Sequence, residues 1–251
     1  MNGDFLSLLP KAQIPQLGGH PPAVAPLEAT TVFAFHCAVG VVIAGDHRAT
    51  AGNVVFSDKT EKILELDSHC LMAIAGVPAT AFEMARTLQT SFEFYRRSQL
   101  QAMSLPAKIR ALAQLLRNNL AATIQGFGVV APIFAGVEAD DPEAVPQIYF
   151  YDPLGAEFEA TNYAGSGSGS GHIKSVLSFL ERWGSPKPEQ MNLKQAVVLA
   201  NRLLLTAATF DTATGGVHPE TKQFATIKIV SRQGIRSLGS DEQAHMWRDS
   251  L

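Results

Sequence analysis

Four residues whose types can carry out acyl transfer are spaced along the first part of this 251-residue chain. Thr30 stands at the start of an apolar, strand-like run, and Asp46 follows it by 16 residues, Lys62 by 32 and Gly76 by 46. Each of these three lies at the end or the beginning of a predicted strand, so all four can meet at one sheet edge. Taken singly, each has an ordinary explanation, because threonine opens strands, charges at sheet ends are solvated and glycine serves turns.

The chemistry that these four types support is nucleophilic attack by a threonine. A threonine hydroxyl is a weak nucleophile until a base removes its proton. A chain cut before Thr30 would have an α-amine with a pKa of about 8, roughly a tenth neutral at pH 7, whereas a lysine with a pKa of about 10.4 stays protonated. The amine is therefore the better base. Lys62 would lower the pKa of the hydroxyl, Asp46 would pair with Lys62, and the Gly76 N–H would donate to an oxyanion.

The segment before Thr30 differs in composition from the rest of the chain. Residues 1–29 hold five of the fourteen prolines, which excludes a core element. We interpret this leader as a flexible tail or as a propeptide removed by cleavage between Ala29 and Thr30, with one peptidase domain over 30–251. An acidic residue precedes its apolar run at 5–9, and the run is too short for a secretory signal, which favours a cytoplasmic location.

Bulk composition narrows the class of protein further. Hydrophobic residues make up 46% and charged residues 17%, enough for a large core. A net charge of −3 gives no basic surface for nucleic acid, and the longest apolar run, at 127–137, is too short to cross a membrane. Cys37 and Cys70 lack metal-binding spacing and are predicted to be buried free thiols, and the histidines form no metal motif. No metal and no cofactor are expected.

Hydrophobic periodicity predicts short strands and long helices. Strands are expected at about 31–37, 40–46, 53–56, 62–66, 70–75, 130–138, 147–152, 157–162, 223–230 and 234–238. Helices are expected at about 78–98, 105–124, 171–183 and 192–210, with a helical tail after Ser240. Ser104 and Asn192 are expected to cap the second and fourth of these helices, and the apolar stripe of the second is expected to run through Leu120 to Ile124.

The order of these elements is strands, two helices, strands, two helices, strands, which is not an alternating βαβ pattern. It predicts an α+β fold, a four-layer αββα sandwich of two antiparallel sheets with a helix pair outside each. Such an arrangement buries every apolar face without a domain boundary.

Six segments, taken together, resemble the signature segments of proteasome β-subunits, the N-terminal-threonine peptidases of the Ntn-hydrolase superfamily. They are Thr30-Thr31, Gly45-Asp46-His47-Arg48-Ala49-Thr50, Lys62-Ile63, Ile74-Ala75-Gly76, Gly167-Ser168-Gly169-Ser170 and Asp211-Thr212-Ala213-Thr214-Gly215-Gly216. The resemblance covers about 30–238 and implies the same four-layer sandwich. It implies that Thr30 is the nucleophile, that Asp46 and Lys62 complete a triad, and that Gly76 supplies the oxyanion donor.

Within this resemblance, Ser168, Asp211 and Thr214 fall on the positions that support the terminal amine. The Gly/Ser stretch around Ser168 reads in isolation as a flexible linker, and it matches neither a P-loop nor a nucleophile elbow. Two registers of the family segment fit it; counting from the flanking elements favours Ser168, with Ser166 as the alternative. The chain departs from the family in having Ala29 where Gly is usual and Thr214 where many relatives have Ser.

The resemblance also implies a substrate pocket and an assembly. The pocket positions are Ala49, Thr60, Leu64, Ile74, Pro78 and Phe82, none of them charged, which predicts cleavage after apolar residues. The expected protein is a bacterial-type threonine endopeptidase that degrades unfolded polypeptides inside heptameric β-rings, with α-subunit rings and a ring ATPase as partners. Two alternatives remain open: a catalytically silent ring subunit, and a ring that assembles without α-subunits.

Overall fold

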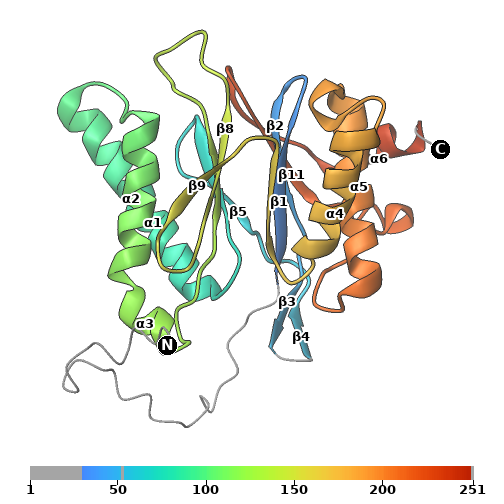
Figure 1. Cartoon of the computed structure of the whole chain (residues 1–251), viewed down its shortest axis with the longest axis horizontal. Helices are drawn as coiled ribbons and strands as arrows, with labels where there is room; N and C mark the ends of the chain where they lie inside the picture. Colours follow the sequence, from blue (N-terminus) through green and yellow to red (C-terminus); the bar gives the residue numbers. More distant parts are fainter. Residues whose placement is uncertain (1–29, 52–53, 250–251) are drawn as a thin grey trace, which may run out of the picture.

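The structure is a computed structural model, and it describes residues 30–51 and 54–249. The leader at 1–29, including Ala29, lies outside the described residues. Two sheets stack at the centre and helices cover the outer face of each (Figure 1). The predicted four-layer αββα sandwich is therefore confirmed.

The first sheet has the strand order β10-β1-β2-β11-β12, and all its neighbouring strands are antiparallel. Its strands are β1 (Thr31–Cys37), β2 (Gly40–Gly45), β10 (Tyr163–Gly167), β11 (Thr226–Ser231) and β12 (Gly234–Ser237). Along β1, Phe33 and Phe35 face one side of the sheet and Val32 and Ala34 the other, as the pleat requires, and all four are buried. Burial on both faces explains why β1 is a nearly continuous apolar run.

The second sheet has the order β5-β6-β7-β8-β9 and is also antiparallel throughout. Its strands are β5 (Ile63–Glu65), β6 (Cys70–Ala73), β7 (Ile133–Gly136), β8 (Gln147–Tyr151) and β9 (Glu157–Ala160). The residues packed between the two sheets are small or branched and almost wholly buried, among them Val32, Ile43, Leu71 and Ile133. This middle core fixes the two sheets face to face.

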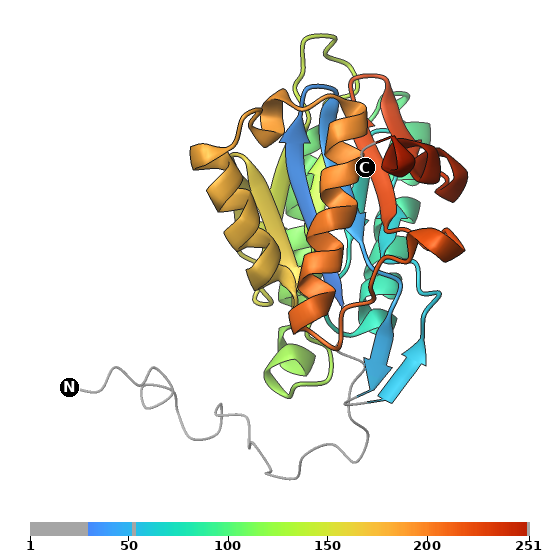
Figure 2. The same ribbon diagram turned by 90° about the vertical axis from the view of Figure 1, so that its right-hand side faces the viewer.

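Two helical layers enclose the sheets (Figures 1 and 2). One layer contains α1 (Pro78–Gln99), α2 (Leu105–Asn118) and the short α3 (Leu120–Ile124), and the other contains α4 (Ser170–Trp183), α5 (Leu193–Phe210) and α6 (Ser240–Arg248). The predicted face of α1, from Ala81 to Phe92, is buried against the second sheet. Asn192 caps α5 through a bond from the Gln195 N–H, as predicted.

A two-stranded ribbon projects from one end of the sandwich (Figure 2). It consists of β3 (Ala49–Ala51) and β4 (Val54–Ser57), which pair antiparallel. Only β4 was expected from the sequence, because β3 is a three-residue strand that follows β2 after a short turn. The ribbon connects the end of β2, which carries Asp46, to the segment that carries Lys62. Two 3₁₀ turns, at Pro188–Gln190 and Pro219–Thr221, complete the described elements.

The predicted single helix over 105–124 is instead two helices, α2 and α3, separated at Asn119. At this break the Asn119 side-chain Nδ2 donates to the Gly128 carbonyl at 2.6 Å. The predicted stripe therefore stops at Leu116, and Leu120 and Ile124 are exposed. Ser104 occupies the N-cap position, but its side chain makes no capping bond.

The carboxylate of Glu138 replaces the expected cap of α2. It accepts a hydrogen bond from the Leu105 N–H at 2.8 Å. A negative charge at the start of a helix also interacts favourably with the helix dipole. The cap thus comes from a residue far along the chain, which no local pattern indicates.

The linker reading of the Gly/Ser stretch is also wrong for its first half. Residues 163–167 form β10, an edge strand paired with β1. The stretch has few of the β-branched residues that mark strands, so its strand character comes from pairing rather than from propensity. This matters for the site, because β10 brings Gly167 and Ser168 beside the start of β1.

Two remaining expectations concern the cysteines and the membrane. Cys37 and Cys70 are both free and buried, as predicted. Burial raises the pKa of both thiols, which keeps them protonated. Among the described residues, no helix is both long enough and apolar enough to span a bilayer.

Candidate active site

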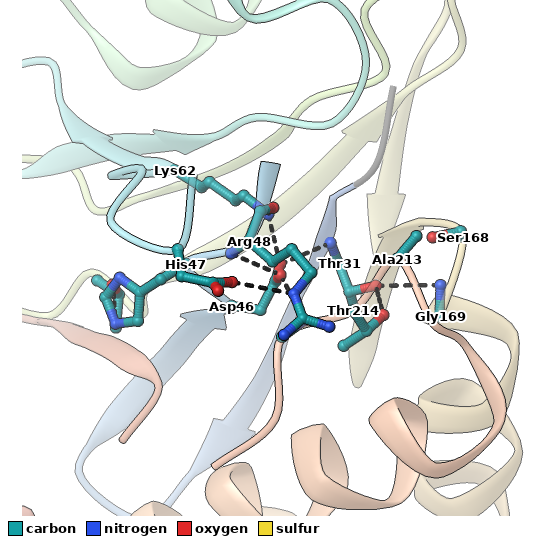
Figure 3. Close-up of polar contacts among 12 residues, drawn as sticks. Thr31, Asp46, His47, Arg48, Lys62, Ser168, Gly169, Ala213 and Thr214 are labelled. Carbon is teal, nitrogen blue, oxygen red and sulfur yellow. Dashed lines mark hydrogen bonds and ion pairs between the residues drawn. The ribbon is translucent and has the colours of Figure 1, made fainter. Parts of the chain in front are cut away.

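Asp46 is the centre of a buried polar cluster at the end of β2 (Figure 3). Its Oδ1 accepts hydrogen bonds from the Lys62 ammonium at 2.6 Å and from the Thr31 N–H at 2.9 Å. Its Oδ2 accepts from the backbone N–H groups of Arg48 at 3.0 Å and Gly215 at 2.8 Å. Four donors to a buried carboxylate fix its orientation.

Lys62 lies just before β5, and its side chain is only 2% exposed. Its ammonium donates to Asp46 and to the backbone carbonyl of Arg48. Burial lowers the pKa of Lys62 from its ordinary value, and the nearby carboxylate of Asp46 opposes that shift. A lysine held in this way is a fixed positive charge whose proton is less tightly bound than that of a surface lysine.

Thr30 is buried, and it adjoins this ion pair along the chain. The next residue, Thr31, bonds through its N–H to the same oxygen of Asp46 that Lys62 contacts. The Thr30 carbonyl accepts a hydrogen bond from the Ser168 N–H at 3.2 Å. Gly167 makes this approach possible, because its φ is +92° and a Cβ there would lie 1.7 Å from the Thr30 oxygen.

Three residues predicted to support a terminal amine lie together beside Thr30. The Asp211 Oδ2 accepts from the Ser168 hydroxyl at 2.6 Å and from the Thr214 hydroxyl at 2.5 Å. Burial alone would raise the pKa of Asp211, but these two hydrogen bonds hold it below its usual range. Ser166, the alternative to Ser168, instead donates to the Ala131 carbonyl. Of the two serines that the sequence left open, Ser168 is therefore the one beside Asp211 and Thr214.

The hydroxyl of Thr31 joins this cluster rather than pointing to open space. It accepts from the Gly169 N–H at 3.0 Å and lies 2.6 Å from the Thr214 hydroxyl. Since the Thr214 proton goes to Asp211, the Thr31 hydroxyl donates to Thr214. Both its proton and a lone pair are engaged, and Thr31 is fully buried. This arrangement favours Thr30 over Thr31 as the free hydroxyl.

Gly76 lies after the end of β6 and has a φ of +109°. It forms an antiparallel bridge with Val130, and a Cβ at this position would lie 2.1 Å from the Val129 carbonyl. The two flanking bonds run from the Val77 N–H to Val129 and from the Ala131 N–H to Ala75. In such a pair the central N–H points away from the partner strand, so the Gly76 N–H is directed away from Val130.

The predicted pocket residues divide into two groups. Leu64, Ile74 and Phe82 all pack in the core under α1, with Leu64 and Phe82 partly exposed at its edge. Pro78 opens α1 and is half-buried. Ala49 is buried in β3, and the Thr60 N–H bonds to the His47 carbonyl at the base of the ribbon. No charged side chain belongs to this set.

Four residues of the site stand in the signature segments, but the sequence assigned them no role. They are Thr31, Arg48, Gly169 and Gly215, which contribute a hydroxyl, a carbonyl and backbone N–H groups. Backbone groups leave no trace in residue type, so the segments that contain Arg48, Gly169 and Gly215 do not reveal these contacts. The side chain of Arg48 donates to the Asp58 carboxylate at 2.9 Å and to the Thr212 carbonyl at 3.2 Å.

Comparison with known proteins agrees with this fold. A family model described as proteasome subunit matches residues 27–218. A proteasome subunit beta of Acidothermus cellulolyticus is 36% identical over 237 residues, which cover 93% of this chain and 78% of the relative. The proteasome subunit beta of Streptomyces griseus is 33% identical over 251 residues, covering 99% and 86%. Proteasome subunit beta 2 of Thermomonospora curvata is 37% identical over 229 residues, covering 91% and 78%.

The chain belongs to the proteasome subunit family. The relatives described here are all β-subunits, and they match over most of their own length. Membership implies assembly with other proteasome subunits.

Proposed function

We propose that this subunit is a threonine endopeptidase whose nucleophile is the hydroxyl of Thr30, exposed when the peptide bond between residues 29 and 30 is cut. The observation that carries the proposal is the sharing of Asp46 Oδ1 by Lys62 and by the N–H of Thr31. This sharing fixes a positive charge beside the first residue of the described chain. The cluster of Ser168, Asp211 and Thr214 lies on the other side of Thr30, where hydroxyl and carboxylate oxygens would accept from an ammonium.

In the proposed reaction the α-amine of Thr30 removes the proton from its own hydroxyl, directly or through one water. The oxygen attacks the scissile carbonyl, and the negative charge that develops on the substrate oxygen is met by the Gly76 N–H. The α-amine of Thr30 then passes the proton to the nitrogen of the leaving peptide. In the second half of the reaction the same amine removes a proton from water, the water oxygen attacks the acyl-enzyme ester, and the Thr30 oxygen leaves and takes that proton. Lys62 remains positively charged and lowers the pKa of the hydroxyl, while Asp46 holds its ammonium in place.

Determining the N-terminus of the assembled, purified protein tests this proposal. We expect the mature chain to begin at Thr30, with residues 1–29 removed, and we expect a threonine-directed peptide epoxyketone to label that residue. Intact mass and N-terminal sequencing before and after labelling measure both. An assembly whose chains keep Met1 and hydrolyse no peptide would contradict the proposal and favour a catalytically silent ring subunit.

The uncharged pocket predicts which substrates are cleaved. We expect peptides with Leu, Phe or Tyr before the scissile bond to have a kcat/KM about 10-fold or more above that of matched peptides with Arg or Glu, because burying an unpaired charge is costly. The measurement is kcat/KM over a series of fluorogenic peptides that differ only at that residue. Equal or faster cleavage after Arg or Glu would refute the assignment of Ala49, Thr60, Leu64, Ile74, Pro78 and Phe82 to the pocket.

We further propose that the working form is a cytoplasmic stack of heptameric β-rings, capped by α-subunit rings and supplied with unfolded polypeptide by a ring ATPase. This proposal rests on the family and on the names of the relatives. The mechanism proposed above requires neither a metal nor a cofactor. A ring formed by this chain alone would instead favour assembly without α-subunits, and native mass spectrometry of the chain expressed with and without an α-subunit separates the two.

A further inference from the structure

Ser166 is the serine of the Gly/Ser stretch that the cluster around Asp211 does not use. It lies on β10 opposite Val32 of β1, two residues along from Ala164, which lies opposite Ala34. Val32, Ala34 and Ala164 belong to the core between the two sheets, so the Ser166 side chain shares the face that meets the second sheet. A hydroxyl on an otherwise apolar face needs a partner, and this one has a specific partner.

That partner is the carbonyl of Ala131, which accepts from the Ser166 hydroxyl at 2.6 Å. Ala131 ends the short segment 129–131 that pairs with residues 75–77. The Ala131 N–H bonds to the Ala75 carbonyl at 2.9 Å, and the Val77 N–H bonds to the Val129 carbonyl at 2.8 Å. Gly76 lies between these two bonds, so the position of the segment sets the direction of the Gly76 N–H.

The same end of β10 also contacts the residue of the proposed nucleophile. The Ser168 N–H bonds to the Thr30 carbonyl at 3.2 Å, two residues from Ser166. Three hydrogen bonds therefore connect the two halves of the site: Thr30 to Ser168, Ser166 to Ala131, and Ala131 to Ala75, the neighbour of Gly76. The middle bond is the one that crosses from the first sheet to the second.

We propose that Ser166 is a positioning residue that holds the oxyanion donor Gly76 at the correct distance from the Thr30 hydroxyl. The inference rests on the proposed peptidase function, and it assigns to Ser166 a task separate from amine support. Thr30 and Gly76 lie at the edges of different sheets, which pack through an apolar core and are also joined by the Lys62–Asp46 ion pair. A directional hydrogen bond at the catalytic edge fixes the relative position of the sheets where transition-state stabilisation depends on it.

The test compares Ser166→Ala and Ser166→Thr with the wild type in the mature, assembled protein. We expect Ser166→Ala to lower kcat about 10-fold with KM changed less than about 2-fold, a smaller loss than the 10²–10³-fold typical of removing an oxyanion donor itself. Ser166→Thr keeps the hydroxyl and should restore most of kcat. Ser175→Ala serves as the control, because that hydroxyl bonds only within α4, to the Gly171 carbonyl, and activity should not change.

A pair of inhibitors separates positioning from general damage. A peptide aldehyde forms a hemiacetal whose oxygen occupies the oxyanion position, whereas the corresponding peptide alcohol binds without reacting. In Ser166→Ala the aldehyde should bind about 10-fold more weakly, in step with kcat, while the affinity for the alcohol stays within about 2-fold.

Three results would overturn the inference while leaving the peptidase function intact. They are a Ser166→Ala variant with wild-type kcat, a Ser166→Thr variant as impaired as Ser166→Ala, and equal weakening of aldehyde and alcohol binding. A wild-type assembly with no peptidase activity would instead overturn the proposed function, and this inference with it.

Discussion

A Thr30→Ala variant is expected to lose peptidase activity by at least about 10³-fold, because it removes the proposed nucleophile and leaves only substrate binding and the oxyanion donor. It should also keep residues 1–29 attached, since the same hydroxyl would attack the peptide bond before it. Thr30→Ser retains a hydroxyl on the same backbone and should keep measurable activity. Peptide hydrolysis and intact mass, measured on the same preparations, report both effects.

Two further threonines make the test of Thr30 specific. Thr31→Ser keeps the hydroxyl that bonds to Gly169 and Thr214, and it should process and hydrolyse peptides close to the wild-type rate. Thr206→Ala removes an exposed hydroxyl that bonds only within α5, and it should have no effect. A Thr30→Ala variant that is still processed and active would show that another residue is the nucleophile. Thr31, next along the chain, would then be tested first by the same substitution.

How far the sequence predicts this molecule depends on the kind of interaction involved. The apolar run of β1 and the apolar face of α1 are local patterns, and the structure confirms them. The spacing of Asp46 and Lys62 predicts their ion pair, because each stands at the end or the start of a strand that the pattern reveals. Hydrophobic periodicity also predicts the four-layer order, because it shows whether an element has one apolar face or two that must be buried against other elements.

The failures share a physical cause, which is that the decisive partner is distant in sequence. Glu138 caps α2 in place of Ser104, although it lies 33 residues beyond the Leu105 N–H that it accepts from. Residues 163–167 become a strand only because β1 offers an edge. The carbonyl of Arg48, which holds Lys62, is a backbone group and has no signature in residue type at all.

The second large effect is expected from Lys62→Met, which keeps the length and apolar body of the side chain and removes its charge. Asp46 would keep three backbone donors but lose the cation, and the carbonyl of Arg48 would lose its partner. Removing one member of a buried ion pair typically costs about 3–5 kcal/mol of unfolding free energy. Without the positive charge, the hydroxyl of Thr30 would lose the group that lowers its pKa. Activity should fall by about 10³-fold, with each unit of pKa worth about tenfold.

Lys108 supplies the control that separates stability from catalysis. It is also a buried lysine, 2% exposed, paired with Asp67 at 2.7 Å and placed over the ring of Phe92. Asp67 follows the end of β5 that is remote from Lys62, so this pair lies away from the candidate site. Lys108→Met should cost somewhat less stability than Lys62→Met, because the Asp67 side chain is 27% exposed and water replaces part of the lost contact.

We therefore expect the two lysine variants both to lose stability but to differ in activity. Both should have lower unfolding midpoints in urea, but only Lys62→Met should lose kcat in the assembled protein at a temperature where all variants remain folded. Equal loss of activity in both variants would mean that the cost is one of stability, and that Lys62 has no chemical role. Full activity in Lys62→Met would remove the fixed positive charge from the mechanism and leave the α-amine of Thr30 as the sole activating group. The structure predicts neither, because the Lys62 ammonium shares its acceptor oxygen with the backbone N–H next to Thr30, whereas Lys108 has no such link.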